Sequence, residues 1–182
     1  MKKILLFSMI SMLAIMTFTS CENDEIDTRE IGYAIKVFPE PCTAWGCSVD
    51  SVKKHMNSYR LSYIDVYEND VTLPDGTVTQ KWLANFAGNN PYSSTNNIIE
   101  YDYCFDESSK GLRAAVVYLG GENQFSDIET QLYDGGYSQT GRDIKDKFYT
   151  YSNGQTSIKI YEMGSNSYYL KYQKSGDDEL IW

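Results

Sequence analysis

Apolar and polar residues alternate in several segments of the chain, and this alternation predicts strands that bury one face. The first such segment is residues 31–37, which Pro39 and Pro41 bring to an end. The short sequences Asn153-Gly154 and Gly164-Ser165-Asn166 are typical of tight hairpins. Further strands are predicted at about residues 61–68, 77–87, 112–119, 146–151, 155–162 and 167–174.

Two segments instead have the spacing of amphipathic helices. Ser48 can cap the first helix, and Ser126 and Glu129 have the spacing of a capping box at the start of the second. Gly135-Gly136 would end the second helix. The apolar faces comprise Val49, Val52, Met56 and Tyr59 in the first helix, and Ile128 and Leu132 in the second.

The order of these elements predicts an α+β domain over residues 31–174. We interpret it as a pseudo-duplicated repeat of one helix plus three strands, with the two copies at about residues 48–119 and 125–174. The strands would form an antiparallel sheet with both helices packed on it. Residues 175–182 then form a C-terminal tail.

The first twenty residues have the pattern of an export signal. Lys2 and Lys3 are followed by an apolar stretch over residues 4–18, and small residues precede Cys21. That stretch has fifteen residues, whereas a helix that crosses a bilayer needs about 20. We therefore expect a cleaved signal peptide over residues 1–20 rather than a retained membrane span.

Residues 18–21, Phe-Thr-Ser-Cys, resemble a bacterial lipobox. The resemblance implies cleavage before Cys21, attachment of lipid to its thiol, and a membrane as the partner of that lipid. The acidic tether at residues 21–30 resembles the segment that directs Bacteroidota-type lipoproteins to the outer face of the cell. It implies an outer-membrane protein that faces the exterior, whereas the alternative is a merely solvated linker.

A second resemblance lies at the first helix. Trp45-Gly46-x-Ser48, followed by Val52 and Met56, is similar to the helix start of many Bacteroidota-type lipoproteins. The helix-then-hairpin order resembles the beta-lactamase-inhibitor-protein-like fold and the small lipoproteins of the outer-membrane barrel-assembly machinery. Both are binding folds, so the resemblance implies a protein inhibitor or an assembly adaptor as an alternative function.

Composition narrows the class of ligand. The chain has a formal net charge of -9 and a sequence pI near 4.6, which disfavours binding to nucleic acid. All 16 Tyr follow the signal segment, and tyrosine suits wet binding surfaces. The polar residues 88–97 lack periodicity and predict a recognition loop. For a glycan or protein ligand we expect contacts from Trp45, Tyr92, Tyr101 and Tyr103, the last two in a half-buried strand.

Three cysteines remain after Cys21, and an exported protein can oxidise a pair of them. Cys42 and Cys47 flank a loop short enough to close, and Cys47 with Cys104 is the alternative pairing. A zinc site is disfavoured, because the cysteine pair has no second pair and His55 is the only histidine. We expect no metal and no cofactor.

Candidate catalytic groups do not converge in the sequence. Cys47 precedes a helix N-terminus, and that position lowers the pKa of a thiol. His55, the only candidate base for this thiol, lies eight residues further on, which is about 12 Å along a helix, so the two side chains would not touch. Glu100 and Asp102 share one strand face, as a glycosidase acid and base could, although such a pair is more typical of a solvated edge. We therefore expect a binding protein without catalytic activity, and a small hydrolase is the weaker alternative.

Overall fold

The computed structural model describes residues 35–72, 75–95, 97–106, 109–121, 123–164 and 166–177. The chain divides into two units, Met1–Tyr33 and Ala34–Trp182, and the described residues all belong to the second. The predicted signal peptide, Cys21, the tether and residues 178–182 of the tail lie outside the described residues. Within the described part of the chain, no helix is long and apolar enough to cross a membrane.

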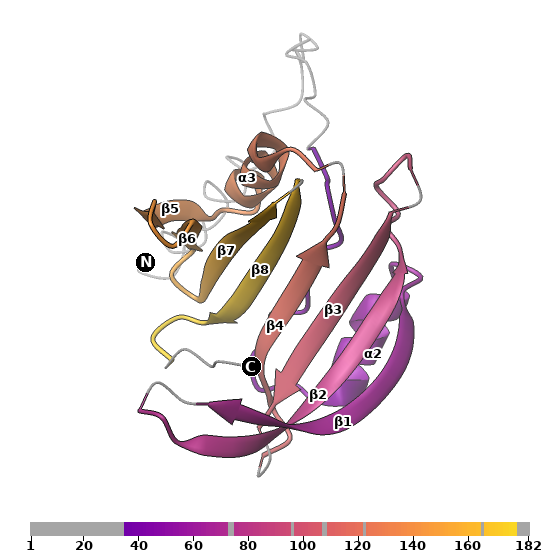
Figure 1. Ribbon diagram of the computed structural model, residues 1–182. Coiled ribbons are helices and arrows are strands. Elements are labelled where there is room, and N and C mark those ends of the chain that lie inside the picture. Colours follow the sequence, from indigo (N-terminus) through magenta and orange to yellow (C-terminus); the bar gives the residue numbers. More distant parts are fainter. Residues whose placement is uncertain are drawn as a thin grey trace, which may run out of the picture. The chain divides into compact units, whose positions relative to one another are not determined.

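The described strands form one antiparallel sheet with the order β1-β2-β3-β4-β8-β7-β6-β5 (Figure 1). Two consecutive meanders meet where β4 pairs with β8. The strands are β1 (Ser62–Thr72), β2 (Val78–Asn89), β3 (Ile98–Phe105), β4 (Leu112–Leu119), β5 (Ser138–Asp143), β6 (Phe148–Ser152), β7 (Thr156–Gly164) and β8 (Ser167–Lys174). With helices α2 (Val49–Asn57) and α3 (Phe125–Asp134), the domain has the predicted α+β class.

The strand number in the predicted repeat is wrong, because four strands follow each helix rather than three. The strand missing from the second half of the prediction is β5, whose sequence Ser-Gln-Thr-Gly-Arg-Asp contains no large apolar residue. An edge strand with no buried face gives no alternating signal, so sequence pattern alone does not reveal it.

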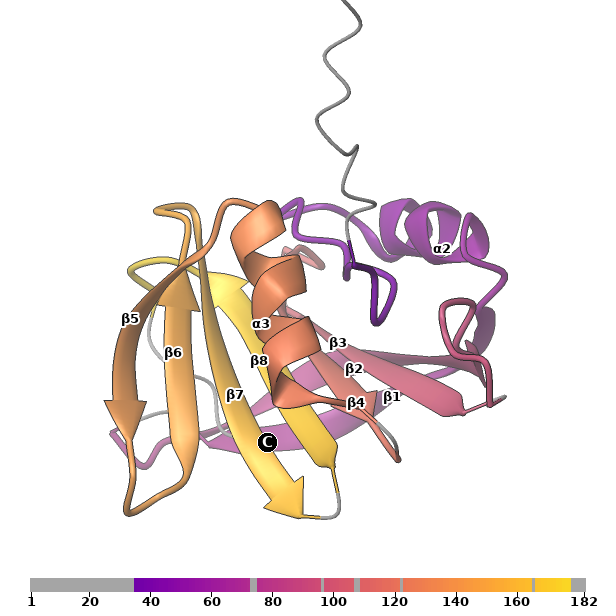
Figure 2. The same ribbon diagram turned by 90° about the horizontal axis from the view of Figure 1, so that it is seen from above.

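Both helices lie on the same face of the sheet (Figure 2). The predicted cap of α2 is confirmed, since the Ser48 side chain accepts a hydrogen bond from the Ser51 N–H. The predicted capping box of α3 is wrong, because the helix begins at Phe125 with Gln124 as an N-cap that makes no side-chain bond. Its end is as predicted, with Gly136 in the left-handed region at φ +82°.

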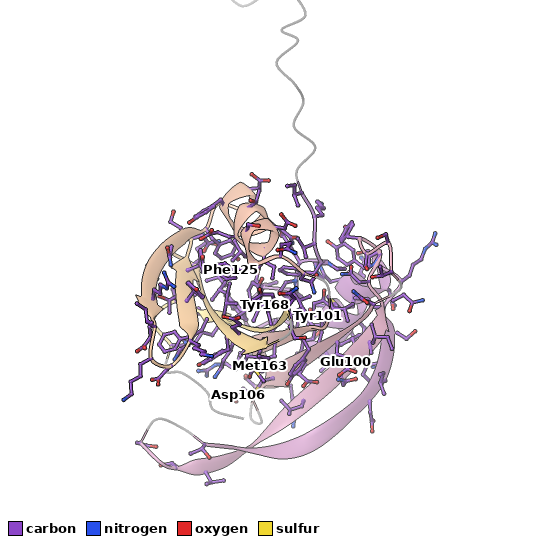
Figure 3. The ribbon with its side chains drawn as sticks, turned by 45° about the horizontal axis from the view of Figure 1, so that its top comes forward. Glu100, Tyr101, Asp106, Phe125, Met163 and Tyr168 are labelled. Carbon is purple, nitrogen blue, oxygen red and sulfur yellow. The ribbon has the colours of Figure 1, made fainter. Side chains whose placement is uncertain are left out.

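The core lies between the helices and the sheet. Val52 and Met56 of α2 and Ile128 and Leu132 of α3 all belong to one buried cluster. The sheet contributes alternate residues to it. Tyr101 and its neighbour Glu100 therefore point to opposite sides of β3 (Figure 3). Tyr101, Tyr103 and Phe86 are completely buried on the helix side.

Residues 35–47 form a strap that crosses the helix side of the sheet without being a strand. The predicted strand at residues 31–37 is therefore wrong over 35–37, and residues 31–34 lie outside the described residues. The end of the strap bonds to β4, since Gly46 N–H donates to Leu112 O (2.8 Å) and Leu112 N–H donates to Cys47 O (2.9 Å). Nearer its start, side chains satisfy the backbone of the strap. Gln131 bonds to Val37 N (2.6 Å), Phe38 N (3.2 Å) and Phe38 O (2.9 Å), and the Tyr101 hydroxyl donates to Pro39 O (2.6 Å).

Candidate functional site

The predicted recognition loop lines a polar hollow at one end of the domain. The hollow has a volume of about 200 Å³ and lies between the loop, the start of the strap and the start of α3. Tyr92 and Asn97 come from the loop, and Asn123, Gln124 and Asp127 come from the α3 side. Segments far apart in the sequence thus present amide, carboxylate and aromatic groups to one cavity.

Asn90 holds the loop in place. Its side chain is 6% exposed, its Nδ2 donates to Val37 O (2.7 Å), and its Oδ1 accepts from Tyr92 N (3.1 Å). The backbone N–H of Asn90 also donates to Asn97 O (2.8 Å). Because one buried amide ties the loop to the strap, the backbone at Tyr92 is held in place before any ligand arrives.

The Tyr92 ring remains 39% exposed on this rigid support, and the Lys36 ammonium lies 5.9 Å from its centroid. A flat ring beside several amide and carboxylate groups can stack on the apolar face of a sugar while the polar groups bond to its hydroxyls. The structure thus brings Tyr92 into a cavity of suitable chemistry.

Tyr101 and Tyr103 cannot contact a ligand, so their predicted role is wrong. Both side chains are 0% exposed and point into the core. The Tyr103 hydroxyl accepts from Cys42 N (3.0 Å) and donates to Met56 Sδ (2.9 Å). Burial raises the pKa of both phenols well above the ordinary value. The strand was predicted correctly, but from Tyr101 onward it is buried on both faces rather than half-buried, and its apolar face carries these tyrosines inward.

Trp45 is half-buried and connects the strap to β7. Its indole Nε1 donates to Thr156 Oγ1 on β7 (3.1 Å), and its ring packs against the core. The residue lines a separate hollow with Arg113 and Lys174. The structure therefore does not bring Trp45 and Tyr92 together, and it gives Trp45 a structural contact.

Of the predicted disulfide partners, Cys42 and Cys47 lie side by side with their Sγ atoms 3.8 Å apart as free thiols. Cys104 is also buried, but Tyr103 and Phe105 on either side of it point into the helix-side core. Alternation places Cys104 on the opposite face of the sheet from Cys47. The geometry thus favours the pairing of Cys42 with Cys47.

Cys47 is not an activated nucleophile. Burial, and then the neighbouring Cys42 thiol, raise the pKa of Cys47 to about 12, which outweighs the lowering expected from the nearby helix N-terminus.

We predict that iodoacetamide alkylates Cys47 slowly in the reduced folded protein between about pH 7 and pH 9, because little thiolate is present. Peptide mass spectrometry measures the alkylation rate of Cys47 at each pH. The reference is the rate in urea, where the thiol pKa returns to about 8.5. If the rate in the folded protein rose with a midpoint near pH 8, the raised pKa of Cys47 would be contradicted.

Two of the other candidate catalytic groups, His55 and Asp102, are occupied in structural contacts. His55 Nε2 lies 2.8 Å from the Glu40 carbonyl oxygen, and its ring meets the edge of Tyr59 at 5.5 Å. Asp102 is 8% exposed and accepts from Asn85 Nδ2 (2.8 Å), whereas Glu100 is exposed. Among the described residues, no group of three His, Cys, Asp or Glu could hold a metal ion.

Sequence reasoning missed a second hollow, on the face of the sheet opposite to α2 and α3. We call it the helix-free face, because no helix among the described residues covers it. It carries an aromatic ladder of Tyr118, Tyr169, Tyr161 and Phe148 and a hollow of about 330 Å³ beside it. Each of these residues occupies an outward position in its own strand, but only strand pairing aligns them.

No family model, curated protein or solved structure matches the chain.

Proposed function

We propose that this protein is a lipid-anchored binding lipoprotein of the outer membrane that faces the cell exterior and recognises a glycan. Cys21 carries the lipid, the acidic tether at residues 21–30 holds the domain away from the membrane, and the hollow at Tyr92 receives the ligand. The domain binds without a catalytic step.

The observation that carries the proposal is the hollow at Tyr92. An exposed ring is held over a cavity that also contains Asn97, Asn123, Gln124 and Asp127. Amides and carboxylates can both exchange hydrogen bonds with sugar hydroxyls. The loop is anchored by buried Asn90, so binding needs little ordering of the protein.

We predict that Tyr92→Ala weakens glycan binding by roughly five- to thirtyfold. This range corresponds to the loss of about 1–2 kcal/mol of stacking and apolar contact. The measurement is a screen of the purified full chain against immobilised neutral glucans, mannans and galactans, followed by titration calorimetry with the best of them.

Tyr133→Ala is the matched control, because Tyr133 is an exposed tyrosine of α3 that is 48% exposed and does not line the hollow. It should bind as the unaltered protein does. Equal affinities for Tyr92→Ala and the unaltered protein would refute the site. Turnover of any bound glycan would refute the absence of catalysis.

A second candidate function is a protein inhibitor or an outer-membrane assembly adaptor. The arrangement of the sheet favours it, because the order β1-β2-β3-β4-β8-β7-β6-β5 is symmetric about the β4–β8 pair and each half follows one helix. Such symmetry is expected of a pseudo-duplicated binding domain. A stoichiometric complex with one outer-membrane or extracellular protein in size-exclusion chromatography, retained in Tyr92→Ala, would favour this candidate over glycan binding.

A further inference from the structure

Cys42 and Cys47 stand at the two ends of a tight turn, where the strap passes into α2 (Figure 2). Between them Gly46 has φ +82°, a left-handed conformation that lets the chain reverse. The two Sγ atoms lie 3.8 Å apart. Because the sulfurs of a disulfide lie about 2.05 Å apart, closure needs an approach of about 1.8 Å. A movement of this size is on the scale of a side-chain rotation.

The sheet holds the backbone on either side of the pair. Gly46 N–H donates to Leu112 O (2.8 Å) and Leu112 N–H donates to Cys47 O (2.9 Å), so β4 fixes one end of the turn. The Cys42 N–H donates to the Tyr103 hydroxyl (3.0 Å), so β3 fixes the other end. Two neighbouring strands thus hold the thiols side by side, and folding raises the effective concentration of each thiol at the other.

Cys47, the more exposed of the two thiols, lacks the property of an exchange-active thiol. Burial raises the pKa of Cys47 to about 12, and the neighbouring Cys42 thiol adds to the rise. An exchange enzyme has a thiol of lowered pKa, whose thiolate stabilises the reduced form and makes the disulfide easy to reduce. The Cys47 thiolate is not stabilised in this way, so the balance is shifted toward a disulfide that persists.

We propose that Cys42 and Cys47 are a disulfide-forming site, and that the bond is a structural lock that fastens the end of the strap at the start of α2. The site goes beyond the proposed glycan binding, since neither cysteine lines the hollow at Tyr92. Formation of the bond in cells rests on the proposed export, because disulfides persist in oxidising compartments. Formation in the purified chain does not depend on export.

The electrons of the bond go to a disulfide oxidant, which is a thiol–disulfide oxidoreductase in the exporting compartment or glutathione disulfide in vitro. Cys42 is 7% exposed and Cys47 is half-buried, so Cys47 meets the oxidant first. The Cys47 thiol loses its proton and attacks the oxidant, which releases one thiol and leaves a mixed disulfide. The Cys42 thiol then loses its proton and attacks the Cys47 sulfur, and the second thiol of the oxidant leaves with that proton.

The first test is equilibration of the purified full chain with mixtures of reduced and oxidised glutathione, both folded and in urea, followed by acid quenching and alkylation in urea. Trypsin cleaves after Lys36 and Lys53, and residues 37–53 contain both cysteines. Closure makes this peptide lighter by two hydrogen atoms and resistant to iodoacetamide. We expect the equilibrium constant for closure to be at least about tenfold larger in the folded protein than in urea.

The second test is thermal denaturation followed by circular dichroism. Dithiothreitol should lower the Tm of the oxidised chain by about 4–8 °C, because the closed loop of six residues restricts the unfolded chain. The Cys42→Ala/Cys47→Ala variant should show no change with dithiothreitol, and Cys104→Ala should show the change of the unaltered protein. Each comparison is made within one variant, so the cost of the substitution itself cancels. If the double variant does not fold, Cys47→Ser at the half-buried position replaces it.

Three results would overturn the site. They are equal equilibrium constants in the folded protein and in urea, a peptide 37–53 linked to the Cys104 peptide at residues 82–110, and a Tm that dithiothreitol leaves unchanged. A bond that forms in the purified chain, but is reduced in protein trapped with acid from native cells, would refute the proposed export and support the site. Both purified-chain tests omit glycans, so their outcome is independent of the hollow at Tyr92.

Discussion

Replacing Gln131 with leucine is expected to lower the free energy of unfolding by about 3 kcal/mol or more. The Gln131 side chain is 5% exposed and makes three hydrogen bonds to the backbone of the strap at Val37 and Phe38. Leucine has a similar volume but no polar atoms, so it leaves these backbone groups without partners. Each unsatisfied buried group costs about 1–3 kcal/mol. Urea denaturation followed by tyrosine and tryptophan fluorescence measures the loss.

Gln155→Leu is the matched control for this change. Gln155 is exposed in the turn between β6 and β7, so the same substitution there should alter the free energy of unfolding by no more than about 0.5 kcal/mol. Similar losses in the two variants would show that the bonds from Gln131 to the strap contribute little. The strap also lines the hollow at Tyr92, so Gln131→Leu should weaken glycan binding as well.

The second large effect is expected in the core. Phe86→Ala should cost about 3–5 kcal/mol, because it removes a fully buried ring and leaves a cavity. The Phe86 ring meets the edges or faces of Tyr63 and Tyr103 at centroid distances of 5.5 and 5.6 Å, so the cavity would open at the centre of an aromatic cluster. Thermal and urea denaturation give the loss in stability.

Two further variants test whether the loss of stability in Phe86→Ala comes from the cavity that it leaves. Phe86→Leu retains part of the volume and should cost less than Phe86→Ala, since the cost grows with the cavity that remains. Ile144→Ala removes an apolar side chain that is 77% exposed and should be nearly neutral. A cost for Phe86→Ala below about 1 kcal/mol would contradict the packing described for β2.

Local pattern in the sequence was sufficient for the elements whose signal is contained in a few neighbouring residues. The cap at Ser48, the buried positions Val52 and Met56, and the end of α3 at Gly135-Gly136 depend on contacts within about one helical turn. Most strands of the sheet were found for the same reason, because burial of one face imposes alternation. The loop that carries Tyr92 was found because it lacks any periodicity.

Only the tertiary structure decided which face of each strand packs against the helices. Alternation shows that Tyr101 and Tyr103 share a face, but it does not say whether that face meets the helices or solvent. The strap shows the same limit, since its apolar alternation resembles a strand while its bonds go to the side chains of Gln131 and Tyr101.

The aromatic ladder is the clearest case of what the sequence left open. Tyr118, Phe148, Tyr161 and Tyr169 are spread over about fifty residues, and only the register of β4, β8, β7 and β6 places them in one row. Register between strands is a long-range property, set by which pairing buries the whole core, so no local segment contains it. The sequence determined the class of most elements, and the tertiary structure determined which of their side chains share a surface.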